Sequence, residues 1–162
     1  MSTTPSPSPT STSSPTPTSG IVVGVDGSEP SLKALHWAVR QAKLTGEQVT
    51  AVIGWEYPAT GWAAMLPGTP AEFDPESLAR QILDETLDKN LDDTVTATIE
   101  RRVVNGPAAQ ILIDASKDAT LLVVGERGYS GFTATLLGSV SLHVTQHAKS
   151  PVVVVRGDHT GS

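Results

Sequence analysis

The sequence predicts a doubly wound α/β domain, in which helices cover both faces of a five-stranded parallel sheet. Short runs rich in valine and isoleucine recur along the chain, and stretches with apolar residues at helical spacing lie between them. Glycine and proline separate the two kinds of segment. Because right-handed crossovers join strands that alternate with helices, such strands form a parallel sheet with helices on both faces.

Five segments have the composition of strands, and they span 21–26, 49–55, 94–104, 121–125 and 152–155. The first and fourth are nearly continuous apolar runs, as expected of strands that are buried on both faces. The third alternates between apolar and polar residues through its first half only, which predicts an edge strand that begins at Thr94.

Four helices are expected between these strands. Ser28 is a good N-cap for the first helix, and Gly46 is a typical residue to end it. The other three helices are expected to begin at Asp74–Pro75, at Gly106–Pro107 and near Ser139, the last of them ending near Ala148. The connection 56–74 is longer than most loops in compact domains, which favours a functional role for it.

One folded domain, 20–157, is expected between two flexible ends. Residues 2–19 contain only serine, threonine and proline, so the tail 1–19 cannot bury enough surface to offset the entropy lost on ordering. The short end 158–162 is expected to be flexible as well.

Charge and composition exclude several classes of function. A net charge of −6 and a pI of about 5.1 argue against bulk binding of DNA or RNA. No apolar run approaches the ~20 residues of a membrane span, and the N-terminus lacks the pattern of a signal peptide. The absence of cysteine excludes a disulfide scaffold and a thiolate metal site. We therefore expect a cytoplasmic protein with neither a nucleic acid nor a membrane as its partner.

Two polar turns that follow the first and fourth strands predict a ligand site. In doubly wound sheets, ligands bind beyond the carboxyl ends of the strands, where the winding changes direction. The first turn is Asp26-Gly27-Ser28, and the second opens the pattern Gly125-x2-Gly128-x9-Gly138-Ser139. If the two strands are neighbours, Asp26 faces this glycine-bearing loop across one crevice.

The chemistry of the loop favours a phosphate group. Glycines at positions 125 and 128 allow a positive φ and a close approach of backbone N–H groups to an anion. The helix start 138–141 presents unpaired N–H groups with a partial positive charge. Ser139 and Ser141 add hydroxyl donors, and Arg127 adds a permanent positive charge.

At these residues the sequence resembles the universal stress protein family, whose nucleotide-binding motif has this glycine spacing. The resemblance extends to Val23–Ser28 and to Pro151–Arg156, and it covers nearly all of 20–157. It implies a Rossmann-like fold of the adenine nucleotide alpha hydrolase type, with strand order 3-2-1-4-5. It also implies that the protein binds an adenine nucleotide, usually ATP, with any Mg²⁺ carried by the triphosphate. Homodimers that pair through Val152–Val155 are a further implication.

The resemblance assigns roles to individual residues. Asp26 matches a contact on the ribose and adenine side, and Gly54 matches a backbone contact to adenine. The ribose-and-phosphate loop corresponds to Val124, Gly125, Arg127 and Gly128. The triphosphate cradle corresponds to Gly138, Ser139, Val140 and Ser141. No residue is implied to be catalytic or to bind a metal directly.

Each of these residues also has a structural interpretation. The glycine loop could serve only to turn the chain, and Asp26 could simply cap the following helix. His143 and His147 have the spacing of metal ligands on one helix face, but surface histidines fit the sequence better. Trp55, Tyr57 and Trp62 could stack on an adenine ring or pack against the protein. Glu126 is expected to face solvent, which leaves no convincing general base for hydrolysis.

Three hypotheses for function follow. The first is a dimeric stress-response protein that binds ATP and changes its conformation or partner preference with occupancy. The second is a slow ATPase or phosphotransferase that uses the same pocket. The third is an interaction module that has lost nucleotide binding. ATP is not distinguished from other adenine nucleotides, including cyclic AMP, by the sequence.

Overall fold

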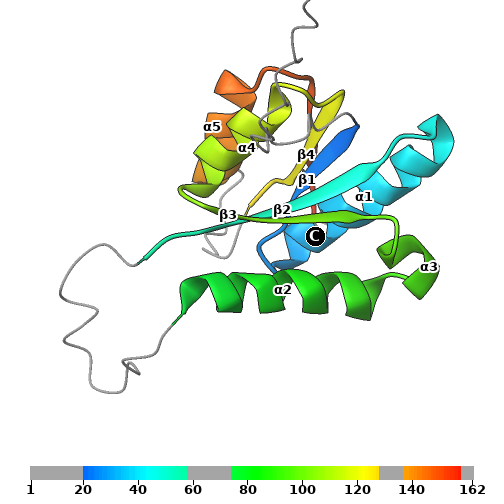
Figure 1. Ribbon diagram of the computed structural model, residues 1–162. Coiled ribbons are helices and arrows are strands. Elements are labelled where there is room, and N and C mark those ends of the chain that lie inside the picture. The colour runs from blue at the N-terminus through cyan, green and yellow to red at the C-terminus, as the bar shows by residue number, and fades with distance from the viewer. Residues whose placement is uncertain (1–19, 58–73, 128–136, 158–162) are drawn as a thin grey trace, which may run out of the picture.

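The computed structural model describes residues 20–57, 74–127 and 137–157 and contains one five-stranded sheet (Figure 1). The strands are β1 (Ile21–Gly24), β2 (Val49–Trp55), β3 (Glu100–Asn105), β4 (Leu121–Gly125) and β5 (Val152–Val155). Their order is β3-β2-β1-β4-β5, and every neighbouring pair is parallel. The predicted fold class and strand order are therefore confirmed. The two ends 1–19 and 158–162, and residues 58–73 of the predicted long loop, lie outside the described residues.

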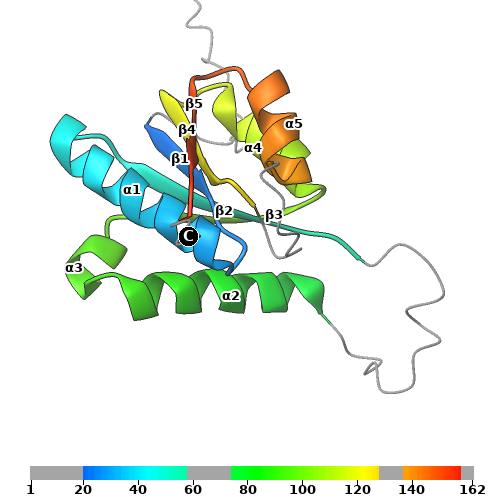
Figure 2. The ribbon, with the colours of Figure 1, turned by 180° about the vertical axis from the view of Figure 1, so that it is seen from behind.

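Helices cover both faces of the sheet, as Figures 1 and 2 show from opposite sides. On one face lie α1 (Glu29–Thr45) and α2 (Pro75–Asn90), and on the other lie α4 (Ala108–Ser116) and α5 (Ser139–His147). A short helix, α3 (Asp93–Thr96), precedes β3. No helix in the described part of the chain has both the length and the apolar character needed to cross a membrane.

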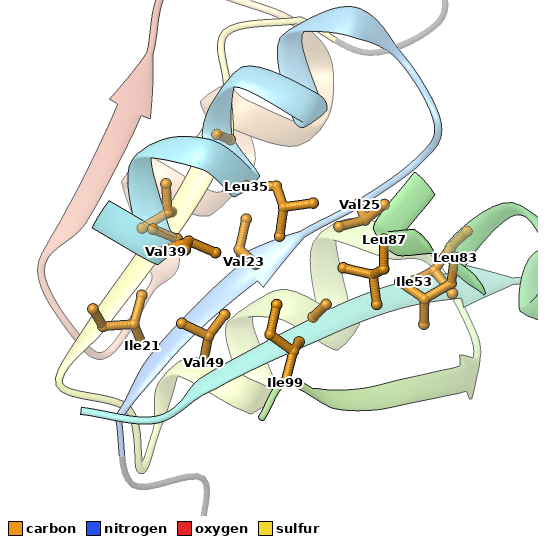
Figure 3. Packing of buried hydrophobic residues seen from close by; sticks show 14 of the residues in the cluster. Ile21, Val23, Val25, Leu35, Val39, Val49, Ile53, Leu83, Leu87 and Ile99 are labelled. Atoms are coloured by element: carbon orange, nitrogen blue, oxygen red, sulfur yellow. The ribbon is translucent and has the colours of Figure 1, made fainter. Parts of the chain in front are cut away.

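The central strand β1 separates two hydrophobic clusters. Ile21 and Val23 point toward α1 and α2, and they pack with Leu35 and Leu87 (Figure 3). Val22 points to the opposite face and belongs to the cluster under α4 and α5. All three β1 side chains are fully buried, because successive residues of a strand alternate between two covered faces.

The ends of α1 follow the local chemistry that the sequence predicts. The Ser28 side chain accepts a hydrogen bond from the backbone N–H of Ser31. At the other end Gly46 has φ 76° and donates its N–H to the Ala42 carbonyl at 2.8 Å. The helix therefore begins and ends where its capping residues stand.

The predicted strand 94–104 is only half correct, because its first part forms α3 and the strand begins at Glu100. Val95 and Ile99 fit the alternation of a strand, but they are also four residues apart and lie on one side of a helical turn. Thr98 donates its N–H to the Val95 carbonyl at 3.0 Å, which continues the turn. The prediction that β3 is an edge strand is confirmed.

The start of β3 is tied to α2 by ion pairs. Arg101 contacts Asp84 at 2.5 Å and Asp88 at 2.9 Å. These carboxylates are four residues apart and therefore lie on the same face of the helix.

Candidate functional site

A small hollow lies where β1 and β4, which are neighbours in the sheet, reach their carboxyl ends. Its volume is about 80 Å³. The chain winds from β1 to β2 in one direction and from β4 to β5 in the other, so this is the point where the winding reverses. The described residues that line the hollow are Gly24, Val25, Asp26, Ser31, Val52, Gly54, Ala108, Ile111, Leu112, Val124, Gly125, Arg127, Val140 and Ser141.

Most of the residues singled out in the sequence meet at this hollow. Those that line it are Asp26, Gly54, Val124, Gly125, Arg127, Val140 and Ser141. Gly138 and Ser139 lie at the start of α5 but do not line the hollow, and Gly128 lies outside the described residues.

Several lining residues were not predicted. Val52 stands two positions before Gly54 in β2, so the alternation of a strand would have indicated it. The lining also includes the α4 residues Ala108, Ile111 and Leu112, because α4 packs on the sheet beside the hollow. The sequence carries no local signal for that packing.

Asp26 has a structural role and also faces the hollow. Its Oδ1 accepts hydrogen bonds from the backbone N–H of Ser28, at 2.9 Å, and from the Ser28 hydroxyl. Its own N–H donates to Ser31 Oγ at 3.3 Å. The structural interpretation of Asp26 is confirmed, and the turn that fixes this residue leaves Oδ2 without a hydrogen-bond partner among the described residues.

Gly125 has a packing role that the sequence does not predict. Among the described glycines a positive φ occurs at Gly20, Gly27, Gly46 and Gly106, and Gly125 does not have one. A Cβ at Gly125 would lie 2.6 Å from the carbonyl carbon of Pro30 and 2.7 Å from its oxygen. Glycine at this position is therefore required by the close packing of α1 on the end of β4.

Close packing also favours glycine at position 54. A Cβ there would lie 2.8 Å from Cδ1 of Ile111 and 3.2 Å from the Gly106 carbonyl oxygen. A side chain at this position would require the Ile111 methyl and the start of α4 to shift.

The start of α5 is fixed to β4 by two hydrogen bonds. Gly138 donates its N–H to the Glu126 carbonyl at 2.8 Å, and the Ser141 hydroxyl donates to the Gly125 carbonyl at 2.5 Å. The Ser141 proton is therefore already used, contrary to the expectation that it would be offered to a ligand. No side chain caps α5, so its first-turn N–H groups at 139–141 have no partner among the described residues.

Glu126 does not face solvent, so that prediction is wrong. Its side chain is buried, and Oε1 accepts a hydrogen bond from the Gly157 N–H at 2.8 Å. It does not line the hollow, where Asp26 is the one carboxylate among the described lining residues.

The aromatic and histidine candidates lie away from the hollow. Trp55 and Tyr57 pack edge to face with their ring centroids 5.4 Å apart, and neither lines it. Trp62 lies outside the described residues. His143 and His147 contact each other on the exposed side of α5, and the described part of the chain contains no group of three or more side chains able to hold a metal.

Comparison with known proteins identifies the family. A model of the universal stress protein family matches residues 19–156. The chain belongs to the universal stress protein family. A universal stress protein of Mycolicibacterium smegmatis is 36% identical over 149 residues, which make up 86% of this chain and 48% of that protein. One from Mycobacterium tuberculosis is 34% identical over 142 residues, which cover 84% of this chain and 44% of that protein. The chain thus spans about half the length of these relatives.

Solved universal stress protein structures share the fold. One in complex with cAMP has a TM-score of 0.60 and 28% sequence identity, and the match covers 87% of this chain and 98% of that one. A universal stress protein from Lactobacillus plantarum has a TM-score of 0.62 at 22% identity, with 87% and 99% covered.

The packing role of Gly125 predicts that Gly125→Ala destabilises the protein in the absence of any ligand, by about 1–3 kcal/mol, because the added methyl meets backbone atoms. Urea denaturation measures the free energy of unfolding. Gly24→Ala is the matched control, since a Cβ there meets mainly the movable Leu112 methyl Cδ1, at 3.0 Å, and it should cost less. Equal stability of the Gly125→Ala variant and the unchanged protein would contradict this role.

Proposed function

We propose that this universal stress protein binds an adenine nucleotide, with ATP as the preferred ligand, and acts as a regulatory module in the stress response. The observation that carries the proposal is the hollow between β1 and β4, with Asp26 and the first turn of α5 both bordering it. The similar structure solved with cAMP supports the ligand class. Because adenine nucleotides are abundant in the cytoplasm, we place the protein there.

The lining residues fit the parts of a nucleotide. Val52, Ile111 and Leu112 give the inner wall an apolar surface for a flat base, and the backbone of Gly54 borders the same wall. Asp26 can accept a hydrogen bond from a ribose hydroxyl through Oδ2.

The phosphates would lie toward Arg127 and the start of α5. Arg127 supplies a permanent charge at the rim, and the unpaired N–H groups at 139–141 supply donors. The hollow of about 80 Å³ is far smaller than the ~300–1,000 Å³ of typical ligand pockets, so part of the nucleotide would extend beyond it.

Binding without efficient turnover fits the described residues best. A general base must reach the water or hydroxyl that it activates. Asp26 is held by Ser28 at one oxygen, and the Glu126 side chain is bonded to Gly157 away from the hollow. Occupancy would then regulate a partner through a difference in affinity between two states of the protein.

We also propose that two copies pair through β5. The carbonyl groups of Pro151 and Val155 accept hydrogen bonds from Leu122 in β4 and from Glu126 directly after it. The alternation of a parallel ladder therefore directs the N–H and C=O groups of Val152 and Val154 to the open edge. All four valines of β5 are only partly buried. An apolar edge with unpaired backbone groups favours pairing with another strand.

Blocking the hollow should abolish nucleotide binding. Ala108 is exposed at the rim, and Ala108→Trp would place an indole there while it leaves the core intact. We expect ATP, AMP and cAMP to bind at least about tenfold more weakly, measured by isothermal titration calorimetry. Ala97→Trp, at an exposed position outside the hollow, is the control and should bind like the unchanged protein. If the unchanged protein binds none of these ligands, the third hypothesis of a module without nucleotide binding replaces this one.

A second assay distinguishes binding from catalysis. Phosphate release from saturating Mg-ATP should stay below ~1 s⁻¹, the low end of typical enzymes, because we assign Asp26, the one carboxylate among the described lining residues, to the ribose, and Glu126 is bonded to Gly157. Faster release that Asp26→Ala reduces would identify an enzyme.

The direction of the backbone N–H groups in β5 predicts a substitution that should separate the proposed dimer. Val154→Pro removes an N–H that points to the open edge, so it should reduce dimerisation in native mass spectrometry and preserve the fold. Val153→Pro is the matched control, because its N–H points to β4 and its loss should destabilise the domain. A dimer that survives Val154→Pro would place the interface elsewhere.

A further inference from the structure

A second and larger concavity lies outside the hollow and shares no described residue with it. Its volume is about 770 Å³, and it extends along α1, past the end of α2, to the end of β5. Five of the eleven lysines and arginines of the chain line it, although the whole chain carries a charge of −6. They are Lys33, Arg40, Lys43, Lys89 and Arg156. We call this surface the basic groove.

The spacing along α1 places basic residues in a continuous stripe. Lys33, His36, Arg40 and Lys43 follow intervals of three and four residues, so they lie along one side of the helix. From Lys33 to Lys43 the stripe is about 15 Å long, at 1.5 Å per residue. Asp92 is the one carboxylate among the described lining residues.

Part of this charge is not neutralised within the protein. Lys89 pairs with Glu85 at 3.3 Å, and Lys33 lies 3.9 Å from Glu29. Arg40, Lys43 and Arg156 are exposed and form no ion pair or hydrogen bond with any described residue. These three side chains are available to an anionic partner.

The floor of the groove identifies the kind of anion. Val39, Leu91, Val95 and Val155 line it and pack against the main hydrophobic cluster. A chain of phosphates gains no binding free energy from an apolar floor. Single-stranded nucleic acid binds through stacking of its bases on aromatic rings. No Phe, Tyr or Trp is among the described lining residues. An acidic protein segment with apolar side chains fits both the charges and the floor.

We propose that the basic groove binds an acidic, partly apolar segment of a partner protein. Carboxylates of the segment pair with Arg40, Lys43 and Arg156, and its apolar side chains cover the valines of the floor. The groove reaches Val155 at the end of the proposed dimer edge, so a bound segment would lie beside the second subunit. This site does not depend on nucleotide binding, because none of its residues lines the hollow.

The test uses the full chain and a short fluorescein-labelled peptide built from glutamate and leucine, with fluorescence anisotropy as the measurement. We expect the double variant Arg40→Glu with Lys43→Glu to weaken binding by about tenfold, and higher ionic strength to weaken binding to the unchanged protein. The charge control is Arg80→Glu with Lys149→Glu, which changes the net charge equally at exposed positions outside the groove. It also breaks the ion pair of Arg80 with Glu76, and it should bind the peptide normally. A peptide with serine in place of leucine should bind more weakly. Arg40→Gln with Lys43→Gln gives a milder variant, and circular dichroism checks that all of them fold.

Several outcomes would overturn the proposal. One is failure of the unchanged protein to bind the peptide, and another is equal loss of binding in the groove and control variants. Tighter binding of inorganic polyphosphate, an oligonucleotide or ATP at the same residues would identify a phosphate site instead. A change in oligomeric state caused by the groove variant alone would identify a second copy of the chain as the occupant.

Discussion

The burial of β1 on both faces is the constraint on which the rest of the structure depends. Ile21, Val22 and Val23 are fully buried, and β2 and β4 flank the strand. A strand in this position needs helices above and below it, so the chain must wind in both directions from the centre. The hollow at the carboxyl ends of β1 and β4 is the geometric result of that reversal. The side chains that line the hollow then determine its chemistry.

Local signals in the sequence were sufficient for most elements. Ser28 and Gly46 mark the ends of α1 because capping depends on the residues at the helix end alone. The sequence predicts a strand from Val95 to Ile99, because apolar residues that alternate along a strand can also lie four positions apart on one side of a helix. Only packing against the core distinguishes the strand from the helix. The strand order came from resemblance to a family, since no local pattern specifies which strands become neighbours.

The sequence predicts where the hollow lies, but it does not predict all the contacts that shape it. Asp26 and Arg127 border the same hollow, as the two polar turns implied. Gly125 allows close packing against Pro30, a residue far away in the sequence, and the side chain of Glu126 bonds to Gly157, 31 residues later in the chain. Both are tertiary contacts, so no pattern near these residues in the sequence predicts them. The residues that α4 contributes were missed for the same reason.

The ion pairs of Arg101 have a consequence beyond tying β3 to α2. They place ionised side chains along one outer border of the sheet, while the opposite border consists of valine. Charged side chains discourage strand addition, so the two borders differ in their tolerance of a neighbour. A sheet that can grow on both borders can form fibres, whereas one that can grow on a single border stops after one addition. The Arg101 ion pairs therefore make the β3 border a poorer site for strand addition than the β5 border.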